Sequence, residues 1–160
     1  MLPRNLSDGP PSDSLAWDDL TRGIPTIAAL AGLCSQMLAS SQSPAVDMNE
    51  LPAESRAILF AAGQTGALGI QGDKNAFEPG ERYLAVCVEL GEGRRLEFRC
   101  PENPEQTIRF MEGFRRLCQS GLVMHQLMNE FSLTAAGFDA AREIDANEVQ
   151  SLIDMGRDGV

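Results

Sequence analysis

The chain has 160 residues, of which 23 are acidic and 13 are basic, so its formal net charge is −10. This length allows one ordinary domain or two very small ones, and a hydrophobic fraction of 43% is enough to build a core. The excess of negative charge argues against a protein that binds nucleic acid or anionic membranes with its whole surface.

The charge is distributed unevenly along the chain. Residues 1–55 and residues 117–160 each contain seven acidic and two basic residues, whereas residues 56–116 contain nine of each. The acidic excess therefore lies at the two ends, and the neutral centre could accept a polyanion if those ends lie elsewhere.

The cysteines and the apolar segments bear on the cellular compartment. The four cysteines are at least 13 positions apart, which excludes CxxC zinc knuckles. The uncharged stretch 23–46 has an apolar centre, residues 24–34, that is too short to span a bilayer. It follows an acidic leader, whereas a signal peptide begins basic. We therefore expect a cytoplasmic protein with reduced cysteines.

Residues 1–23 are predicted to form a disordered acidic arm, because Gly9-Pro10-Pro11 cannot continue a helix or strand. Within it, Leu15, Trp17 and Leu20 lie among acidic residues and are candidate partner-binding residues of a short docking motif. The alternative is that Trp17 folds back onto its own domain or hangs free.

The folded domain is expected over residues 25–155, with a frayed tail at 156–160. Two helices come first: one begins at Pro25 and runs to about Ala39, and the other begins at Pro52 and stops near Gly63 or Gly66. A short strand at residues 68–70 and a loop at residues 72–80 follow.

The clearest strand signal lies at residues 83–100. Residues 83–90 alternate between apolar and other side chains, Gly91-Glu92-Gly93 supplies a turn, and residues 94–100 return. The alternation places Leu96, Phe98 and Cys100 inward and Arg95, Glu97 and Arg99 outward. This pattern predicts a β-hairpin.

A well-capped helix is predicted at residues 104–120, with Asn103 as its N-cap and Gly121 at its end. Its expected apolar side comprises Ile108, Met111, Phe114, Leu117 and Cys118. Two short strands at residues 122–127 and 130–133 follow, then a helix capped by Thr134 and a last helix that begins near Asp145.

The segments Phe114–Val123 and Glu130–Gly137, which read FRRLCQSGLV and EFSLTAAG, resemble the latter half of a winged-helix domain. The resemblance covers residues 104–144. It implies that a helix ends at Gly121, that two strands form a wing, and that Thr134 starts the closing helix. A β-hairpin precedes residue 104, where the family has the first helix of its helix-turn-helix pair.

The resemblance also makes helix 104–120 a candidate recognition helix, with Arg109, Arg115 and Arg116 as candidate nucleic-acid-binding residues. Two of these arginines have an acidic residue four positions earlier, Glu105 before Arg109 and Glu112 before Arg116. This order favours surface ion pairs, so a solvated, internally paired helix face is the alternative interpretation.

Signatures of catalysis are weak. His125 is the single histidine, so a site with several histidine ligands is excluded, and a Cys–His pair would have to use Cys118 or Cys87 as nucleophile. The glycine-rich segment 63–69 lacks the lysine of a phosphate-binding loop. We assign no catalytic, cofactor-binding or metal-binding residues.

The sequence thus predicts a single α+β domain with N-terminal helices, a central β-hairpin and a winged-helix-like C-terminal half. The favoured function is a non-catalytic cytoplasmic regulatory or scaffolding module that binds a protein partner or forms a homodimer. The first alternative is a winged-helix DNA-binding transcriptional regulator, and the second is a Cys–His hydrolase or transferase.

Overall fold

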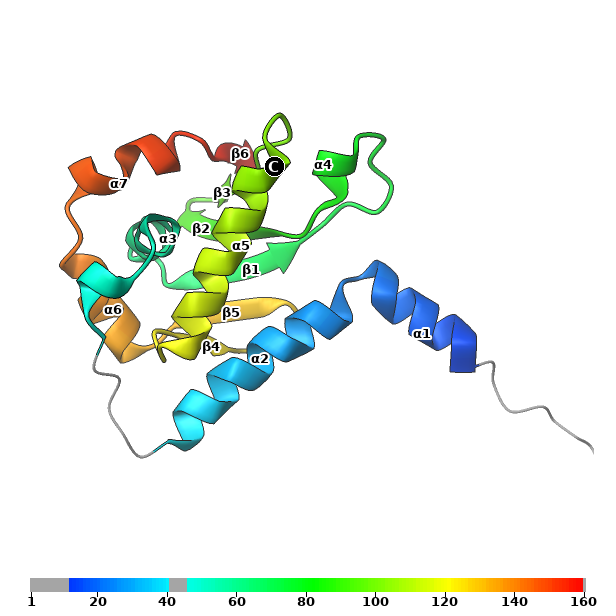
Figure 1. Cartoon of the computed structure of the whole chain (residues 1–160), viewed down its shortest axis with the longest axis horizontal. Coiled ribbons are helices and arrows are strands. Elements are labelled where there is room, and N and C mark those ends of the chain that lie inside the picture. The colour runs from blue at the N-terminus through cyan, green and yellow to red at the C-terminus, as the bar shows by residue number, and fades with distance from the viewer. Residues whose placement is uncertain (1–11, 41–45, 160) are drawn as a thin grey trace, which may run out of the picture.

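The computed structural model describes residues 12–40 and 46–159, with the side chains of 12–16 excepted, and folds them into an α+β domain (Figure 1). The described helices are α1 (Ser12–Thr21), α2 (Ile24–Ala39), α3 (Ala53–Ala62), α4 (Pro79–Arg82), α5 (Pro104–Gln119), α6 (Ala135–Arg142) and α7 (Ala146–Ile153), with a 3-10 turn at Met48–Glu50. The described strands are β1 (Ala67–Gln71), β2 (Ala85–Gly91), β3 (Arg94–Glu97), β4 (Val123–His125), β5 (Glu130–Leu133) and β6 (Arg157–Gly159).

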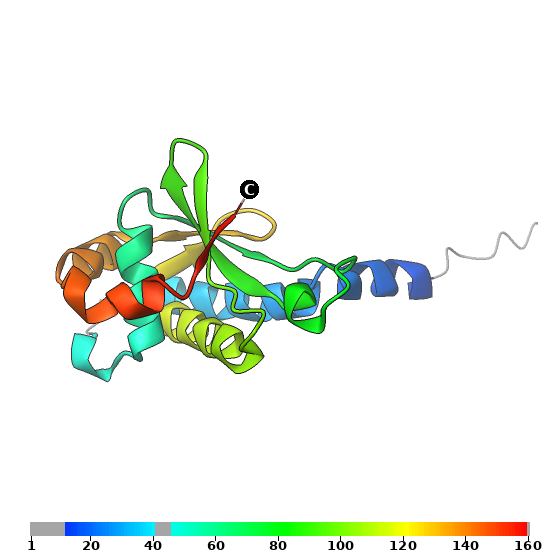
Figure 2. The ribbon, with the colours of Figure 1, turned by 90° about the horizontal axis from the view of Figure 1, so that it is seen from above.

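The strands form one antiparallel sheet in the order β4-β5-β1-β2-β3-β6. Leu68 pairs with Val88 and Ile70 with Val86, so the alternating apolar residues of β1 and β2 share one face. Helices α2 and α5 lie on this side of the sheet (Figures 1 and 2). The opposite face carries polar side chains, as an antiparallel sheet allows.

Four phenylalanines fill the space between helices and sheet. Phe98 and Phe110 lie with ring centroids 4.6 Å apart, and Phe114 meets Phe131 edge-on at 5.1 Å. All four are fully buried, so these aromatic pairs join α5 to β5 and to the segment after β3.

The local signals for helices and turns are confirmed. The side chain of Asn103 accepts a hydrogen bond from the backbone N–H of Gln106, and the Thr134 hydroxyl accepts one from the backbone N–H of Gly137. The predicted helix from Pro25 to Ala39 corresponds to α2, and the predicted hairpin corresponds to β2 and β3 around Gly91–Gly93.

The buried side of α5 is only partly as predicted. Phe114, Leu117 and Cys118 are buried, but Ile108 is 50% exposed, whereas Phe110 is fully buried. Gly113 is also buried, because α5 packs closely against α3. Because α5 packs against both α2 and α3, its buried side differs from the one that the spacing of its apolar residues predicts.

Both predicted chain ends need correction. Residues 12–21, assigned to a disordered arm, form helix α1, while residues 1–11 lie outside the described residues. The predicted frayed tail contains β6, which pairs antiparallel with β3 through Leu96 and Asp158. Tertiary contacts of Arg157 hold this strand in place, as described below.

The two strands predicted after helix 104–120 are present as β4 and β5, and they are not a free-standing hairpin. β4 pairs with β5, and β5 also pairs with β1, so the hairpin forms one edge of the six-stranded sheet. The element that precedes α5 is β3, as the sequence indicated.

Among the helices in the described ranges, none combines the length and apolar character needed to cross a bilayer.

Candidate functional site

Helix α1 projects from the body of the domain (Figures 1 and 2). Trp17 is 67% exposed and Leu20 is 53% exposed. The alternative in which Trp17 folds back onto its own domain is therefore not what the structure shows. Leu15 lies on the same helix, but its side chain is outside what the structure describes.

The joint between α1 and α2 is narrow and built around Gly23. This glycine has φ +70°, and a Cβ there would lie 2.8 Å from a Leu84 methyl carbon. The left-handed backbone favours glycine, and a larger residue would also have to displace the end of the Leu84 side chain. The amides of Arg22 and Gly23 donate to the carbonyls of Asp19 and Leu20, which closes α1 immediately before the joint.

A hollow of about 290 Å³ lies at the base of α1, and we call it the hinge pocket. Its apolar lining comes from Leu20, Pro25 and Leu84. Its charged lining residues are Arg22, Lys74 and Arg82. Among the described residues that line it, none is acidic. The hinge pocket therefore combines an apolar surface with positive charge.

The loop after β1 forms the other flank of this region. The Arg82 guanidinium donates hydrogen bonds to the carbonyl oxygens of Ala76 at 3.3 Å and Phe77 at 3.4 Å. Phe77 is 91% exposed, so the loop presents an aromatic ring to solvent. The loop and α1 lie on the same side of the molecule in both views (Figures 1 and 2). Leu20 of α1 and Lys74 of this loop both line the hinge pocket.

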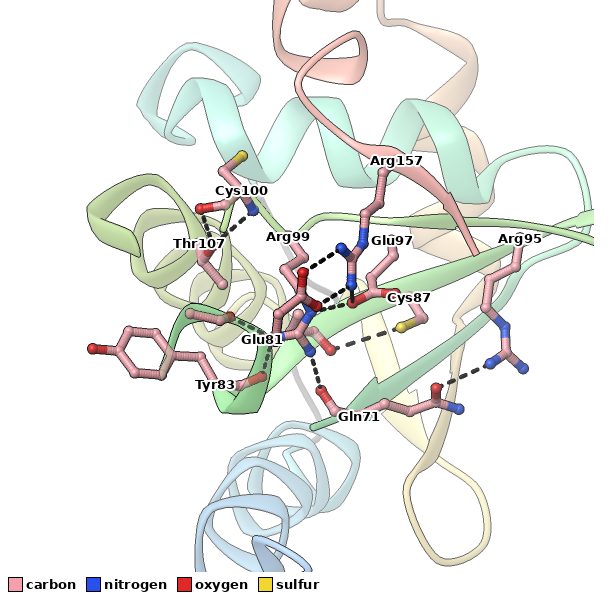
Figure 3. Close-up of polar contacts among 12 residues, drawn as sticks. Gln71, Glu81, Tyr83, Cys87, Arg95, Glu97, Arg99, Cys100, Thr107 and Arg157 are labelled. Carbon is pink, nitrogen blue, oxygen red and sulfur yellow. Dashed lines mark hydrogen bonds and ion pairs between the residues drawn. The ribbon is translucent and has the colours of Figure 1, made fainter. Parts of the chain in front are cut away.

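A second cluster is buried beside the end of β3 (Figure 3). Arg99 is only 3% exposed, which corrects its predicted outward orientation. Its guanidinium forms an ion pair with Glu97 and donates to the backbone carbonyls of Gly80, Tyr83 and Gln71. A buried guanidinium is stable only when its N–H groups have hydrogen-bond acceptors, and these partners supply them. Arg99 therefore joins β1, α4 and β3.

Arg157 extends this cluster to the end of the sheet (Figure 3). It donates to both carboxylate oxygens of Glu81, at 2.8 and 2.6 Å, and approaches Glu97 at 3.4 Å. The hydrogen bonds from Arg157 lower the pKa of Glu81, and the same bonds raise the pKa of Arg157. The neighbouring hollow of about 560 Å³ is lined by Glu81 and Arg157, which pair with each other, by Arg99, whose ion-pair partner is Glu97, and by Glu102. The cluster is explained by its structural role.

The candidate nucleic-acid-binding residues lie on the exposed side of α5, where acidic residues pair with Arg109 and Arg115. Arg109 pairs with Glu105 at 2.6 Å, which confirms one predicted ion pair. Glu112 pairs with Arg115 at 3.2 Å, so the predicted Glu112–Arg116 pair is wrong. This surface has alternating charge.

The candidate Cys–His pair is not assembled. The thiol of Cys118 shares a hydrogen bond with the thiol of Cys34, and both residues are buried between α2 and α5. The His125 Nε2 atom forms a hydrogen bond with the carbonyl oxygen of Met128 at 2.8 Å, and its ring packs on Phe131. Cys87, the other candidate nucleophile, has its pKa raised to about 11, chiefly by burial.

Within the described ranges, no three His, Cys, Asp or Glu side chains are grouped so that they could hold a metal ion. All four cysteines are free thiols.

Comparison with known proteins adds no identity: no family model, no curated protein and no solved structure matches the chain. The winged-helix resemblance of residues 104–144 therefore stays a prediction.

Several residues of these sites were missed from the sequence. Lys74 and Phe77 lie in the segment 72–80, for which the sequence predicts only a loop. Arg99 and Arg157 gave no local signal, because their partners lie far away along the chain.

Proposed function

We propose that this protein is a non-catalytic, cytoplasmic regulatory or scaffolding module that acts by binding a protein through α1. The observation that carries the proposal is the 67% exposure of Trp17 on a projecting helix. Tryptophan is the residue type most enriched at the energetic centres of protein interfaces, and leaving this much apolar area in water is unfavourable.

The joint supports this role because it holds α1 away from the body. Gly23 and Leu84 fit closely, and the Arg22–Asp18 ion pair of 3.0 Å spans the last turn of α1. A helix presented in a defined orientation loses less conformational entropy when it binds. Phe77, on the loop that contributes Lys74 to the hinge pocket, is a further exposed apolar side chain.

The chemistry of the thiols supports a binding role over catalysis and favours a reducing compartment. Cys34, Cys87 and Cys118 are buried and unbridged, and burial raises the pKa of Cys87 to about 11. A nucleophilic cysteine needs the opposite shift, toward the thiolate. The hydrogen bond from His125 to a backbone carbonyl gives that ring a structural role.

Quantitative affinity capture from native lysate tests the proposal. Three tagged proteins are compared: the native sequence, a Trp17→Ala/Leu20→Ala variant, and a Leu38→Ala control. Leu38 is 58% exposed at the far end of α2, so the control removes a similar apolar side chain elsewhere.

We expect the double variant to lose the proteins that the native chain and the control retain. Circular dichroism and thermal melting should be unchanged, because the altered side chains are largely exposed. Equal recovery of the same proteins by all three chains would show that α1 is not the binding surface.

A further inference from the structure

We propose that the protein bound at α1 is a second copy of this chain, and that each α1 lies over the hinge pocket of the other copy. This inference rests on the proposed function and specifies its partner. The observation behind it is that α1 and the hinge pocket have complementary chemistry.

The first part of the complementarity is apolar. Trp17 and Leu20 are more than half exposed on α1, and Phe77 is almost entirely exposed on the loop beside the hinge pocket. Leu20, Pro25 and Leu84 give the pocket an apolar lining. A second α1 placed there would remove apolar surface of both copies from water.

The second part is electrostatic. The hinge pocket presents Arg22, Lys74 and Arg82, whereas α1 places Asp18 and Asp19 directly after Trp17. An acidic helix with an apolar centre is therefore the kind of segment that this basic, apolar pocket fits. The chain carries such a helix itself.

Existing contacts identify which charges are available for a partner. Arg22 already pairs with Asp18, and Arg82 is engaged with the carbonyls of Ala76 and Phe77. In the described part of the chain, neither the ammonium group of Lys74 nor the carboxylate of Asp19 has a hydrogen bond or ion pair. Lys74 of one copy and Asp19 of the other are therefore the expected new pair.

Two-fold symmetry allows both contacts to form at once. The hinge pocket lies at the base of the same helix that carries Trp17, so two antiparallel α1 helices can each cover the other's pocket. Such an interface uses the same patch on both copies, and every pairwise contact occurs twice. A single substitution therefore changes two contacts in the dimer.

Sedimentation velocity of the full chain between about 1 and 100 μM tests this inference, in the range where small interfaces dissociate. We expect a reversible monomer–dimer equilibrium. Trp17→Ala should raise the dissociation constant about tenfold or more, as truncation of a central aromatic does, while Leu38→Ala leaves it unchanged.

A charge exchange examines the pairing itself. Asp19→Lys and Lys74→Glu should each weaken the dimer, because each places two like charges together at both symmetric contacts. The double variant Asp19→Lys/Lys74→Glu should recover most of the native association, since it restores opposite charges. If the two copies associated through Trp17 without pairing Lys74 with Asp19, the double variant would not recover the native association.

Three results would overturn the inference: a monomer at every concentration, a dimer that survives Trp17→Ala, or a double charge variant no tighter than the single ones. The proposed function fails separately. If the chain is monomeric but capture from lysate still depends on Trp17, the partner is a different protein. If capture is also independent of α1, both proposals are wrong.

Discussion

Arg157 and Glu81 form a two-bond ion pair, at 2.8 and 2.6 Å, between positions that are 76 residues apart in the chain. The pair attaches β6 to α4, and Arg157 also reaches Glu97 on the neighbouring strand β3. It explains why a segment expected to be frayed becomes the sixth strand of the sheet.

Arg157→Ala should lower the free energy of unfolding by about 1 kcal/mol, the scale of a partly exposed bidentate pair after solvent screening. Amide hydrogen exchange should accelerate mainly in β6 and along the β3 edge that it covers. Arg142→Ala, which removes an exposed pair with Asp139, is the matched control and should leave both measurements unchanged. Unaltered exchange in β6 would contradict the role of Arg157.

The same pair should make stability depend on pH. Hydrogen bonds from Arg157 lower the folded-state pKa of Glu81 below the unfolded value, which is about 4.3. The stabilisation that the Arg157–Glu81 pair gives is therefore complete above the unfolded-state pKa of Glu81. It is lost as the pH falls through the folded-state pKa of Glu81. The difference in unfolding free energy between the native chain and Glu81→Gln should shrink between about pH 5 and pH 3. A difference that stays constant over this range would show that the carboxylate is not coupled to folding.

Arg99→Ala should be much more damaging than the loss of a surface arginine. It removes the ion pair with Glu97 and leaves three backbone carbonyls, the buried one of Gly80 and the partly buried ones of Gln71 and Tyr83, without this donor. We expect a loss of about 2–4 kcal/mol in urea unfolding. Arg94→Ala, at an exposed position on β3, should change stability by less than about 0.5 kcal/mol. Similar losses for both variants would refute the structural role of Arg99.

Two glycines on helices should respond oppositely to alanine. A Cβ on Gly113 would lie 2.9 Å from the backbone nitrogen of Ser55, where α5 meets α3, and the Ser55 hydroxyl donates to the Gly113 carbonyl at 2.7 Å. Gly113→Ala should therefore destabilise the protein by about 1–3 kcal/mol, the usual range for overpacking. Gly32→Ala meets nothing within 4 Å and should stabilise by up to about 1 kcal/mol through helix propensity. Thermal melting of both variants decides this, and a stabilised Gly113→Ala would show that the two helices are not in close contact.

The thiols should react unevenly with iodoacetamide in the folded protein. Cys87 has its pKa raised to about 11, so only about one thiol in a thousand is ionised at pH 8. Cys100 is less buried and should be the first to react, although burial also raises its pKa. Peptide mapping at intervals, with urea-unfolded protein as the reference, gives the order. Fast labelling of Cys118 in the folded chain would instead favour the Cys–His alternative.

Much of the secondary structure could be predicted because its signals are local. Asn103 and Thr134 cap helices with side-chain oxygens that reach amides three residues ahead. The alternation along β2 and the turn at Gly91–Gly93 define the hairpin. The candidate site was half predicted: Trp17 and Leu20 were identified, but Lys74 and Phe77 of the neighbouring loop were not.

The errors share a physical cause. Arg99 was placed outward because strand alternation treats an arginine as a solvent-facing residue, yet carbonyls from β1 and α4 satisfy it in the interior. Ile108 was placed inward because it is apolar, but the close contact of Gly113 with α3 turns it outward. In each case the deciding group comes from a distant part of the chain.

The sequence by itself determined the α+β class, the helix caps, the central hairpin and the acidic, apolar character of the segment around Trp17. Those features depend on neighbouring residues and on periodicity. Only the tertiary structure decided the sheet order, the burial of Arg99, the attachment of β6 and the position of the basic hinge pocket beside α1. These depend on hydrogen bonds and packing between segments separated by tens of residues, and no local pattern encodes which distant groups will meet.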